Sequence, residues 1–435
     1  MTSYEIIGGK PLAGTITPQG AKNEALQIVA AVLLTNQPVL VHNIPDIIDV
    51  NKIIELIEGM GVFVENRGSG TFLFHAENID TGFFTKEEYL QCAGALRGSV
   101  LLIGAMLFRL GCARIPNPGG DKIGRRPLDT HFSALSKLGA TVHYDSKNMM
   151  YEIDGKNLKG SYIHLGEPSV TGTANLVMAA LRAKGTTTIY NAACEPYIQQ
   201  LCKMLNSMGA KISGIGSNLL SIVGVDELSG CEHTVLPDMI EIGSFIGLAA
   251  MTSSEITIQN CRVDMLGLIP DVFRKLGIII NIKDDTIHIP KQDRYEIETL
   301  INGSILTIYD APWPGFTPDL LSILLVVATQ AKGSVLIHQK MFESRLFFVD
   351  KLIDMGSQII LCDPHRATVI GLDKQVPLRG IRMTSPDIRA GVALLIAALA
   401  AEGTSIIENV HQIDRGYERI DERLNNLGAD IKRLE

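Results

Sequence analysis

The chain has 435 residues, 46% of them hydrophobic and 20% charged, which is a composition typical of folded globular proteins. This length favours two or three domains, and the composition excludes largely disordered and fibrous classes. Asp and Glu number 47 against 39 Lys and Arg, a net charge of −8. We therefore expect no general binding to nucleic acid or to an anionic membrane, and an anionic ligand would need local clusters of cations.

The cysteines and the apolar runs narrow the class further. The seven cysteines are scattered, and none forms the C-x-x-C pair of zinc ribbons and thioredoxin-like redox motifs. We see no metal-ligating cluster and expect neither a metal nor a cofactor. The N-terminal segment lacks the basic and apolar regions of a secretory signal, and the longest apolar runs, 320–328 and 390–401, fall short of the ~20 residues of a membrane-spanning helix. These features predict a cytoplasmic protein with reduced thiols.

One helix-ending pattern recurs along the whole chain. An apolar residue is followed three positions later by Leu or Met and then directly by Gly, which is typical of a helix that ends at a glycine cap. After five of the six copies comes a short β-like run. The six glycines are Gly61, Gly139, Gly209, Gly277, Gly356 and Gly428.

A second element precedes each copy of this pattern. It is a short helix that is apolar almost all round, followed by a turn and a β-rich run. The predicted helices span 24–34, 99–108, 174–183, 244–251, 320–328 and 390–401, and the predicted strands span 39–43, 112–116, 186–191, 255–260, 334–339 and 404–409.

The apolar helices predict an unusual architecture. A helix that is apolar on every face must be buried on every face. Three helix–strand–helix–strand units closing around their apolar helices would make one globule with strands outside, so six units make two. The alternative, an ordinary doubly wound α/β protein, would need longer and more apolar strands. We therefore predict an α/β chain of two domains, each with pseudo-three-fold repeats.

The starts of the apolar helices are polar. Ser99, Thr173 and Ser244 are interpreted either as helix caps or as parts of an anion site, since helix N-termini attract both. We place three cations, Lys22, Arg389 and Arg415, at or just before helix starts. A cation there opposes the helix dipole at a cost of about 0.3–1 kcal/mol, and a bound anion would remove the conflict.

Residues 116–127 contain three glycines and three prolines, which excludes regular structure, together with Lys122, Arg125 and Arg126. A long basic loop of this kind is typical of a lid or a phosphate clamp. The alternative is an exposed, solvated loop.

Seven motifs together carry a family resemblance. They read PLAGTITPQGAKNEAL, PGGDKIGRRPLDTH, NAACEP, LPDMIEIGSF, MFESRLFFVDKLIDMG, DIRAGVALLIAALAAEG and HQIDRGYERI. In order and spacing the chain resembles the UDP-N-acetylglucosamine 1-carboxyvinyltransferases (enolpyruvyl transferases, MurA) of the EPSP synthase superfamily. The resemblance implies two inside-out α/β barrel domains with the active site in the cleft between them. It assigns 1–20 with 237–435 to domain I, which carries the base and phosphate-binding side, and 21–236 to domain II, which carries the mobile loop 116–127.

The resemblance also implies a reaction. The enolpyruvyl group of phosphoenolpyruvate would pass to the 3′-hydroxyl of UDP-N-acetylglucosamine by addition and elimination of phosphate, the first committed step of peptidoglycan synthesis. These two small molecules are the expected partners, with no nucleic acid and no membrane. Two alternatives stay open: an inactive ligand-binding paralogue, and an enolpyruvyl transferase for another acceptor.

By the same resemblance, particular residues receive roles. Asp319 corresponds to the base that takes the hydroxyl proton. Lys22, Arg126 and Arg415, assisted by Arg389, correspond to the cations that hold phosphoenolpyruvate. Substrate contacts are implied for Lys22, Asn23, Arg97, Arg126, Pro127, Leu128, Asp129, Thr130, Ser169, Val170, Asp319, Met341, Arg345 and Arg389. The chain departs from the family pattern at Met239, Leu321, Ser344 and the pair Glu167 and Pro168, which bears on the sugar and uridine contacts.

The remaining catalytic position, a cysteine in most family members, is Asp121 here. Some branches carry aspartate naturally, so we interpret it as a working variant. An aspartate with the reference pKa of about 3.9 is a poor acid at neutral pH. Loop closure would raise that pKa, whereas Lys122, Arg125 and Arg126 would lower it. We expect a more acidic pH optimum than that of a cysteine enzyme.

Because a carboxylate is a much weaker nucleophile than a thiolate toward the epoxide of fosfomycin, we predict intrinsic resistance. Incubation with fosfomycin should leave the activity of the wild-type chain unchanged, and an Asp121→Cys variant should be inactivated with time. Mass spectrometry of both proteins checks this, and a covalent adduct on the wild-type chain would contradict it. The pH–rate profiles of the same pair test the expected difference in pH optimum.

Overall fold

The computed structural model describes residues 2–120 and 123–435, so Asp121 and Lys122 lie outside the described residues. Tertiary contacts divide the described chain into two compact units. The first comprises residues 2–19, 123–125 and 237–435, and the second comprises residues 20–120 and 126–236. The assignment therefore changes near residues 19–20 and 236–237, and the short segment 123–125, inside the range of the second unit, is counted with the first.

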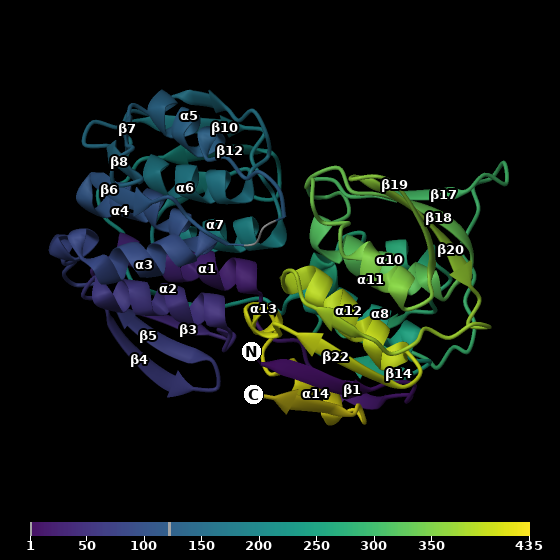
Figure 1. The fold of residues 1–435 in the computed structure, drawn as a ribbon. Helices are drawn as coiled ribbons and strands as arrows, with labels where there is room; N and C mark the ends of the chain where they lie inside the picture. The colour runs from purple at the N-terminus through teal and green to yellow at the C-terminus, as the bar shows by residue number, and fades with distance from the viewer. Residues whose placement is uncertain (1, 121–122) are drawn as a thin grey trace. The chain divides into compact units, whose positions relative to one another are not determined.

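The first unit encloses three apolar helices, which contact one another and are almost completely buried. They are α8 (Met239–Met251), α10 (Leu321–Thr329) and α12 (Ile388–Ala400), and Figure 1 shows them inside strands of the same unit. The surrounding sheets have the strand orders β21-β22-β1-β23, β15-β16-β14-β2 and β17-β18-β20-β19. These strands are β1 (Ser3–Ile7), β2 (Ala13–Ile16), β14 (Glu255–Ile258), β15 (Asn281–Lys283), β16 (Thr286–Ile289), β17 (Leu306–Tyr309), β18 (Lys332–His338), β19 (Gln358–Asp363), β20 (Arg366–Leu372), β21 (Arg382–Thr384), β22 (Thr404–Glu408) and β23 (Ile431–Leu434).

The second unit repeats this plan with α1 (Lys22–Ala31), α4 (Leu102–Leu110) and α6 (Val170–Ala180), of which α4 contacts both others. Its sheets run β13-β3-β5-β4, β11-β12-β10-β9 and β6-β8-β7. The strands are β3 (Val39–His42), β4 (Phe63–Gly68), β5 (Thr71–His75), β6 (Cys112–Pro116), β7 (Thr141–Asp145), β8 (Met150–Asp154), β9 (Tyr162–His164), β10 (Thr186–Tyr190), β11 (Lys211–Ser213), β12 (Leu219–Val223) and β13 (Cys231–Thr234). The prediction of apolar helices inside and strands outside is confirmed in both units.

Each repeat has a second helix that ends at one of the six glycines of the sequence pattern. These glycines adopt positive φ angles, from +88° at Gly277 to +105° at Gly209, where a side chain would be strained. A strand follows all six, because β4 completes the set of five predicted from the sequence. The helices are α2 (Ile48–Gly59), α5 (Asp129–Lys137), α7 (Pro196–Ser207), α9 (Ile269–Arg274), α11 (Val349–Asp354) and α14 (Ile420–Asn425).

The interpretation of Ser99, Thr173 and Ser244 as N-caps is wrong. Ser99 lies within the 3-10 segment Arg97–Leu101 that precedes α4. The helices α6, α8 and α12 begin earlier than predicted, and their caps are Ser169, Asp238 and Asp387, whose side-chain oxygens accept backbone N–H groups of the first turn. The hydroxyl of Ser99 instead donates to backbone carbonyls, at 2.7 Å to both Ala93 and Leu96, and Thr173 accepts the N–H of Ala193 at 2.9 Å. A hydroxyl inside a buried helix must find a partner, and these three find one in the interior.

No single helix among the described residues is long and apolar enough to cross a membrane. Two consecutive helical segments, α3 (Glu87–Ala95) and Arg97–Leu110, are long and apolar enough only when taken together, and the chain bends by 105° between them.

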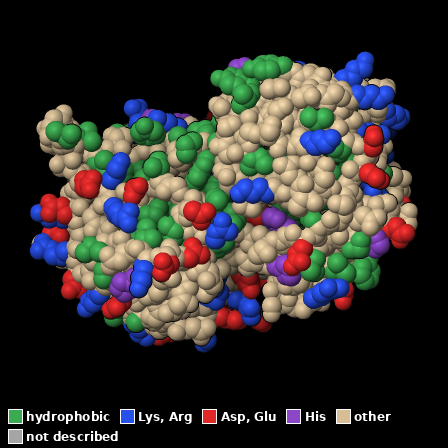
Figure 2. Space-filling view, turned by 180° about the vertical axis from the view of Figure 1, so that it is seen from behind, with side chains coloured by type: hydrophobic (Ala, Val, Ile, Leu, Met, Phe, Trp, Pro, Cys, Tyr) green, Lys and Arg blue, Asp and Glu red, His purple; other side chains and the backbone are tan. Residues whose placement is uncertain are grey.

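On the face seen in Figure 2, basic and acidic side chains are interspersed.

Each unit has a buried glutamate in the first turn of the helix that follows a passage of the chain from one unit to the other. Glu24 of α1 accepts from the ring of His233 at 2.9 Å and from the N–H of Leu236 at 3.2 Å. Glu241 of α8 accepts from the N–H of Gln19 at 2.7 Å and from both terminal nitrogens of Arg423, at 2.5 and 3.1 Å. Burial raises the pKa of both carboxyls, and the basic partner of each opposes that shift. Glu24 thus holds the segment 233–236, which ends the second unit, and Glu241 holds Gln19, which precedes the first passage of the chain.

We predict that Glu24→Ala lowers the free energy of unfolding by about 3 kcal/mol, because two buried polar partners lose their acceptor. Glu24→Gln should cost less than about 1 kcal/mol, since its amide oxygen still accepts from Leu236 and its NH₂ group can donate to a neutral His233 ring. Urea unfolding of the three proteins measures this. Equal losses in both variants would contradict the assigned role of the hydrogen bonds.

Candidate functional site

In the first unit, a half-buried carboxylate lies between two arginines. Asp319 belongs to the 3-10 turn Pro318–Leu320 that leads into α10, and Thr317 caps this turn by accepting the N–H of Asp319 at 3.4 Å. The Asp319 carboxylate accepts from Arg345 at 2.6 Å and from Nε of Arg389 at 3.3 Å. Both arginine side chains are less than one-tenth exposed. Two cations at this distance stabilise the negative charge and fix the orientation of the carboxylate.

Arg389 is the second residue of α12, as the sequence placed it, and Asp387 caps that helix by accepting the N–H groups of Arg389 at 2.8 Å and Ala390 at 3.0 Å. Burial lowers the pKa of Arg389, but Tyr417, Asp319 and Asp238 outweigh it and the net shift is upward. Its Nη1 atom is buried and has no hydrogen-bond partner among the described residues, and the same holds for Nε of Arg345. Buried N–H donors of this kind suit an anionic ligand.

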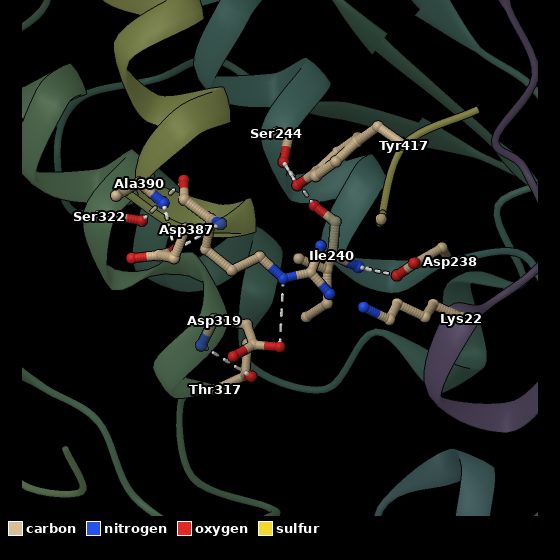
Figure 3. Close-up of polar contacts among 12 residues, drawn as sticks. Lys22, Asp238, Ile240, Ser244, Thr317, Asp319, Ser322, Asp387, Ala390 and Tyr417 are labelled. Carbon is tan, nitrogen blue, oxygen red and sulfur yellow. Dashed lines mark hydrogen bonds and ion pairs between the residues drawn. The ribbon is translucent and has the colours of Figure 1, made fainter. Parts of the chain in front are cut away.

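Tyr417 lies beside Arg389 in the same buried cluster, which Figure 3 shows together with Ser244, Asp238 and Asp319. Its hydroxyl is 2.9 Å from Oγ of Ser244, and the guanidinium carbon of Arg389 lies 5.4 Å from the centre of its ring. The sequence analysis missed Tyr417, although it lies in the motif that contains Arg415.

The placement of Arg415 at a helix start is wrong. It follows the last residue of the short helix α13 (His411–Asp414), and its Nη1 atom donates to Gln412 at 2.9 Å. A cation at a helix C-terminus agrees with the dipole, so the proposed conflict does not apply to this residue. The next residue, Gly416, packs against the start of α12, since a Cβ atom there would lie 2.4 Å from the side chain of Ile388.

Met341, a predicted contact residue, is 40% exposed and lies on a turn held by a buried carboxylate. Asp310 accepts the N–H groups of Lys340 and Met341, the latter at 3.2 Å, and the side-chain amide of Gln339 at 2.5 Å. Burial raises the pKa of Asp310, and the backbone N–H donors oppose that shift. Two of the departures from the family pattern, Met239 and Leu321, are buried in the core of the unit.

In the second unit, Lys22 is the first residue of α1 and is paired with a carboxylate that the sequence analysis missed. Its Nζ atom lies 2.6 Å from Asp49 of α2, and both side chains are less than one-tenth exposed. Asn23 follows it in the same first turn. The pair joins the starts of α1 and α2. Because the two residues are 27 positions apart, their spacing in the sequence did not predict the contact.

A second group of predicted residues gathers at the starts of α5 and α6. Arg97 donates to the carbonyl of Arg126 at 2.6 Å, and burial, with a contribution from Arg126, lowers the pKa of Arg97 to about 10. Thr130 donates to Glu167 at 2.9 Å, and Ser169 caps α6. Val170 begins α6 and Asp129 begins α5, with Pro127 exposed and Leu128 buried just before it.

His131 lies in the first turn of α5 and is buried, and its Nε2 atom forms a hydrogen bond of 2.9 Å with the hydroxyl of Thr171. Its Nδ1 atom has no partner among the described residues. Burial, with a smaller contribution from Arg97, lowers the pKa of the ring to about 4. Across the described parts of the chain, no three His, Cys, Asp or Glu side chains gather in a way that would hold a metal ion.

Comparison with known proteins places these residues in a family. The model of the EPSP synthase (3-phosphoshikimate 1-carboxyvinyltransferase) family matches residues 6–424. UDP-N-acetylglucosamine 1-carboxyvinyltransferases from Bacteroides thetaiotaomicron and Porphyromonas gingivalis are each 64% identical over 434 residues, with 100% of both chains covered. The chain belongs to the UDP-N-acetylglucosamine 1-carboxyvinyltransferase branch of the EPSP synthase family.

Solved structures support the fold at much lower identity. The enolpyruvyl transferase NikO from Streptomyces tendae is 23% identical with a TM-score of 0.86, covering 100% of this chain and 99% of the other. An EPSP synthase from Acinetobacter baumannii is 18% identical with a TM-score of 0.73 and covers 100% of both chains. The two-domain α/β fold therefore persists where most residues have changed.

The ring of His131 should stay neutral at pH 5, because its folded pKa of about 4 lies below the reference value of 6.5. Between these two pKa values the unfolded chain binds the proton more readily than the folded chain does. The free energy of unfolding therefore decreases as the pH falls through 6.5 toward 4. We expect the difference in free energy of unfolding between wild type and His131→Gln to fall by about 2 kcal/mol from pH 7 to pH 5. NMR titration, with the variant identifying the resonance, checks the protonation state, and a ring pKa near 6.5 would contradict it.

Proposed function

We propose that this chain transfers the enolpyruvyl group of phosphoenolpyruvate to the 3′-hydroxyl of UDP-N-acetylglucosamine and releases phosphate, the first committed step of peptidoglycan synthesis. The observation that carries the proposal is the 64% identity over the full length to curated enzymes with that name. The presence of Lys22, Asp319 and Arg415 supports an active enzyme over an inactive ligand-binding paralogue.

The cations would hold the anionic substrate. Arg389 is fixed on one side by Asp319, and its buried Nη1 donor suits an oxygen of phosphoenolpyruvate. Arg415 is the proposed second cation of the first unit. Lys22 and Arg126 are proposed to contribute from the second unit, where Asp49 neutralises part of the lysine charge and orients it.

Asp319 is proposed as the base. The sugar hydroxyl attacks C2 of phosphoenolpyruvate while a proton adds to C3, and the carboxylate accepts the proton that the hydroxyl loses. Arg345 and Arg389 would otherwise weaken the carboxylate as a base. An anion bound at Arg389 offsets the arginine charge, so the proton affinity of Asp319 would rise when substrate is present. Elimination of phosphate from the tetrahedral adduct, with loss of a C3 proton, then forms the enol ether.

The proposal assigns the acid to Asp121, which lies outside the described residues, and with it resistance to fosfomycin. The nucleotide sugar is proposed to contact Asn23, Arg97, Arg126 to Thr130, Ser169 and Val170 in the second unit and Met341 in the first. The side-chain hydrogen bond between Thr130 and Glu167 links two of these segments and supports a common subsite. The nucleotide sugar remains the proposed acceptor despite the apolar departures, because Met239 and Leu321 are buried.

We predict that the wild-type chain releases phosphate from phosphoenolpyruvate only when UDP-N-acetylglucosamine is present. Asp319→Asn should lower kcat at least about 100-fold, as expected for loss of a general base. The matched control is Asp430→Asn, which removes an exposed pair with Lys10 in the same unit and should change kcat less than about twofold.

Continuous phosphate detection, with mass spectrometry of the nucleotide product, distinguishes the outcomes. A wild-type chain that binds both substrates and releases no phosphate would contradict the transferase proposal. Activity of Asp319→Asn equal to that of the control would remove Asp319 from the role of base and leave the transferase proposal intact.

A further inference from the structure

Resting on this proposed function, we propose that Arg433 is a positioning residue for Arg415, the proposed second cation of the first unit for phosphoenolpyruvate. Arg433 lies in β23, and no step of the proposed reaction uses it. It binds two aspartates, one directly before Arg415 in the sequence and one shortly after it, and so fixes the short backbone segment that carries Arg415.

The guanidinium of Arg433 meets both aspartates in two-point contacts. Its Nη1 and Nη2 atoms donate to the two oxygens of Asp414 at 2.8 and 2.9 Å. Its Nε and Nη2 atoms donate to the two oxygens of Asp421 at 3.0 and 3.1 Å. Contacts of this kind set the direction of a carboxylate as well as its distance. An isolated exposed ion pair contributes little, but one arginine joined to two carboxylates forms a network, and the Asp421 side chain is only 11% exposed.

Tyr4 supports the arginine from the neighbouring strand. It lies opposite Arg433 in the antiparallel pair of β1 and β23, and its hydroxyl accepts from Nη2 at 2.6 Å. The guanidinium carbon lies 4.9 Å from the centre of the tyrosine ring. Burial raises the pKa of Tyr4, so the phenol stays protonated and donates to Asp421 at 3.2 Å. Because Arg433 is held by two paired strands, it is a fixed point for the aspartates.

The two aspartates lie on either side of Arg415. Asp414 is the last residue of α13 and directly precedes Arg415, and Asp421 is the second residue of α14 (Figure 1). A helix of four residues has little stability of its own, so contacts with the rest of the unit decide where α13 lies. The Arg415 side chain donates to Gln412 of the same helix at 2.9 Å. Movement of α13 would therefore move both the backbone and the guanidinium of Arg415.

The middle of the segment is held by a different residue. The side-chain Nε2 atom of Gln19 donates to the carbonyl of Gly416 at 2.9 Å, and its Oε1 atom accepts the N–H of Glu418 at 2.6 Å. These contacts do not involve Arg433. Removal of Arg433 would thus loosen the two ends of the segment and leave its middle in place.

The charges near Tyr4 explain why the ends would shift. The hydroxyl of Tyr4 lies 3.4 Å from Asp414 and 3.2 Å from Asp421, so the two carboxylates are close to each other. Burial raises the pKa of Asp421, but hydrogen bonds and charge from Arg433 outweigh it and the net shift is downward. Without the guanidinium, like charges would repel. Asp414 would then move away and displace α13.

The test is a set of steady-state measurements on the full chain, with each substrate varied in turn at saturation of the other. Arg433→Gln should raise KM for phosphoenolpyruvate about tenfold and change kcat and KM for UDP-N-acetylglucosamine less than about threefold. Arg433→Lys keeps the charge and loses the planar fork, so KM for phosphoenolpyruvate should rise about threefold. A loss of folding alone would lower Tm and the active fraction, and would not select one substrate.

Two further comparisons show whether Arg433 acts through Arg415. In an Arg415→Gln background, Arg433→Gln should raise KM for phosphoenolpyruvate less than about twofold further, because the side chain that it positions is gone. If turnover in that background is too slow, the apparent Kd for phosphoenolpyruvate from thermal stabilisation with UDP-N-acetylglucosamine present replaces KM. The matched control is Arg294→Gln, which removes a two-point ion pair with Asp373 in the same unit and should leave both KM values unchanged.

The inference is overturned if Arg433→Gln leaves KM for phosphoenolpyruvate within about twofold of wild type, if Arg294→Gln raises it equally, or if the effects of Arg433→Gln and Arg415→Gln are fully additive. Should Arg433→Gln fail to fold, Asp414→Asn decides by the same twofold criterion. Wild-type turnover is measured first, so loss of the inference with an active wild type leaves the transferase proposal standing. A wild-type KM in Arg415→Gln would remove the role of Arg415 and this inference together.

Discussion

The structure depends on one constraint: six helices that are apolar on nearly every face have to be covered on every face. Burial of such side chains is worth roughly 1.5–3 kcal/mol for each large residue, so three helices packed together and enclosed by strands are strongly favoured over a layout that exposes them. In the first unit α8, α10 and α12 contact one another, and sheets surround them. The strands can remain short, since each has only one face to bury.

This constraint decides where charge can lie. The middle of each central helix has no room for an ionised group, so charged side chains enter the interior at the helix starts, where backbone N–H groups and solvent are near. Lys22, Glu24, Glu241 and Arg389 all lie within the first three residues of a central helix. Each of these has an opposite charge or a titratable partner beside it, because an unpaired buried ion would cost several kcal/mol.

Such pairs also prepare the site for chemistry. Asp319 and Arg389 are held in place before any ligand arrives, so little side-chain entropy remains to be lost on binding. The arginine keeps a buried donor for which the described residues provide no acceptor. The Nε atom of Arg389 already donates to Asp319, whereas its Nη1 atom has no acceptor among the described residues. Such an arginine is suited to bind an anion.

The sequence by itself determined the repeats, the buried helices and the identity of the family, because local periodicity and motif order are properties of the chain. The glycines that end the second helices, such as Gly139 and Gly356, were identifiable because a positive φ angle favours a residue without a side chain. Lys22 and Arg389 were marked as unusual because a cation conflicts with a helix start. Helix limits were less certain: Ser169 and Asp238, and not Thr173 and Ser244, proved to be the caps.

Only the tertiary structure decided the partners. Asp49 lies 27 residues from Lys22, and Arg389 lies 70 residues from Asp319, so neither pair follows from spacing along one helix or strand. The contact of Ser244 with Tyr417 spans 173 residues. Such contacts arise when separate repeats close around a common core, and the packing of that core, more than any local preference, sets which side chains meet.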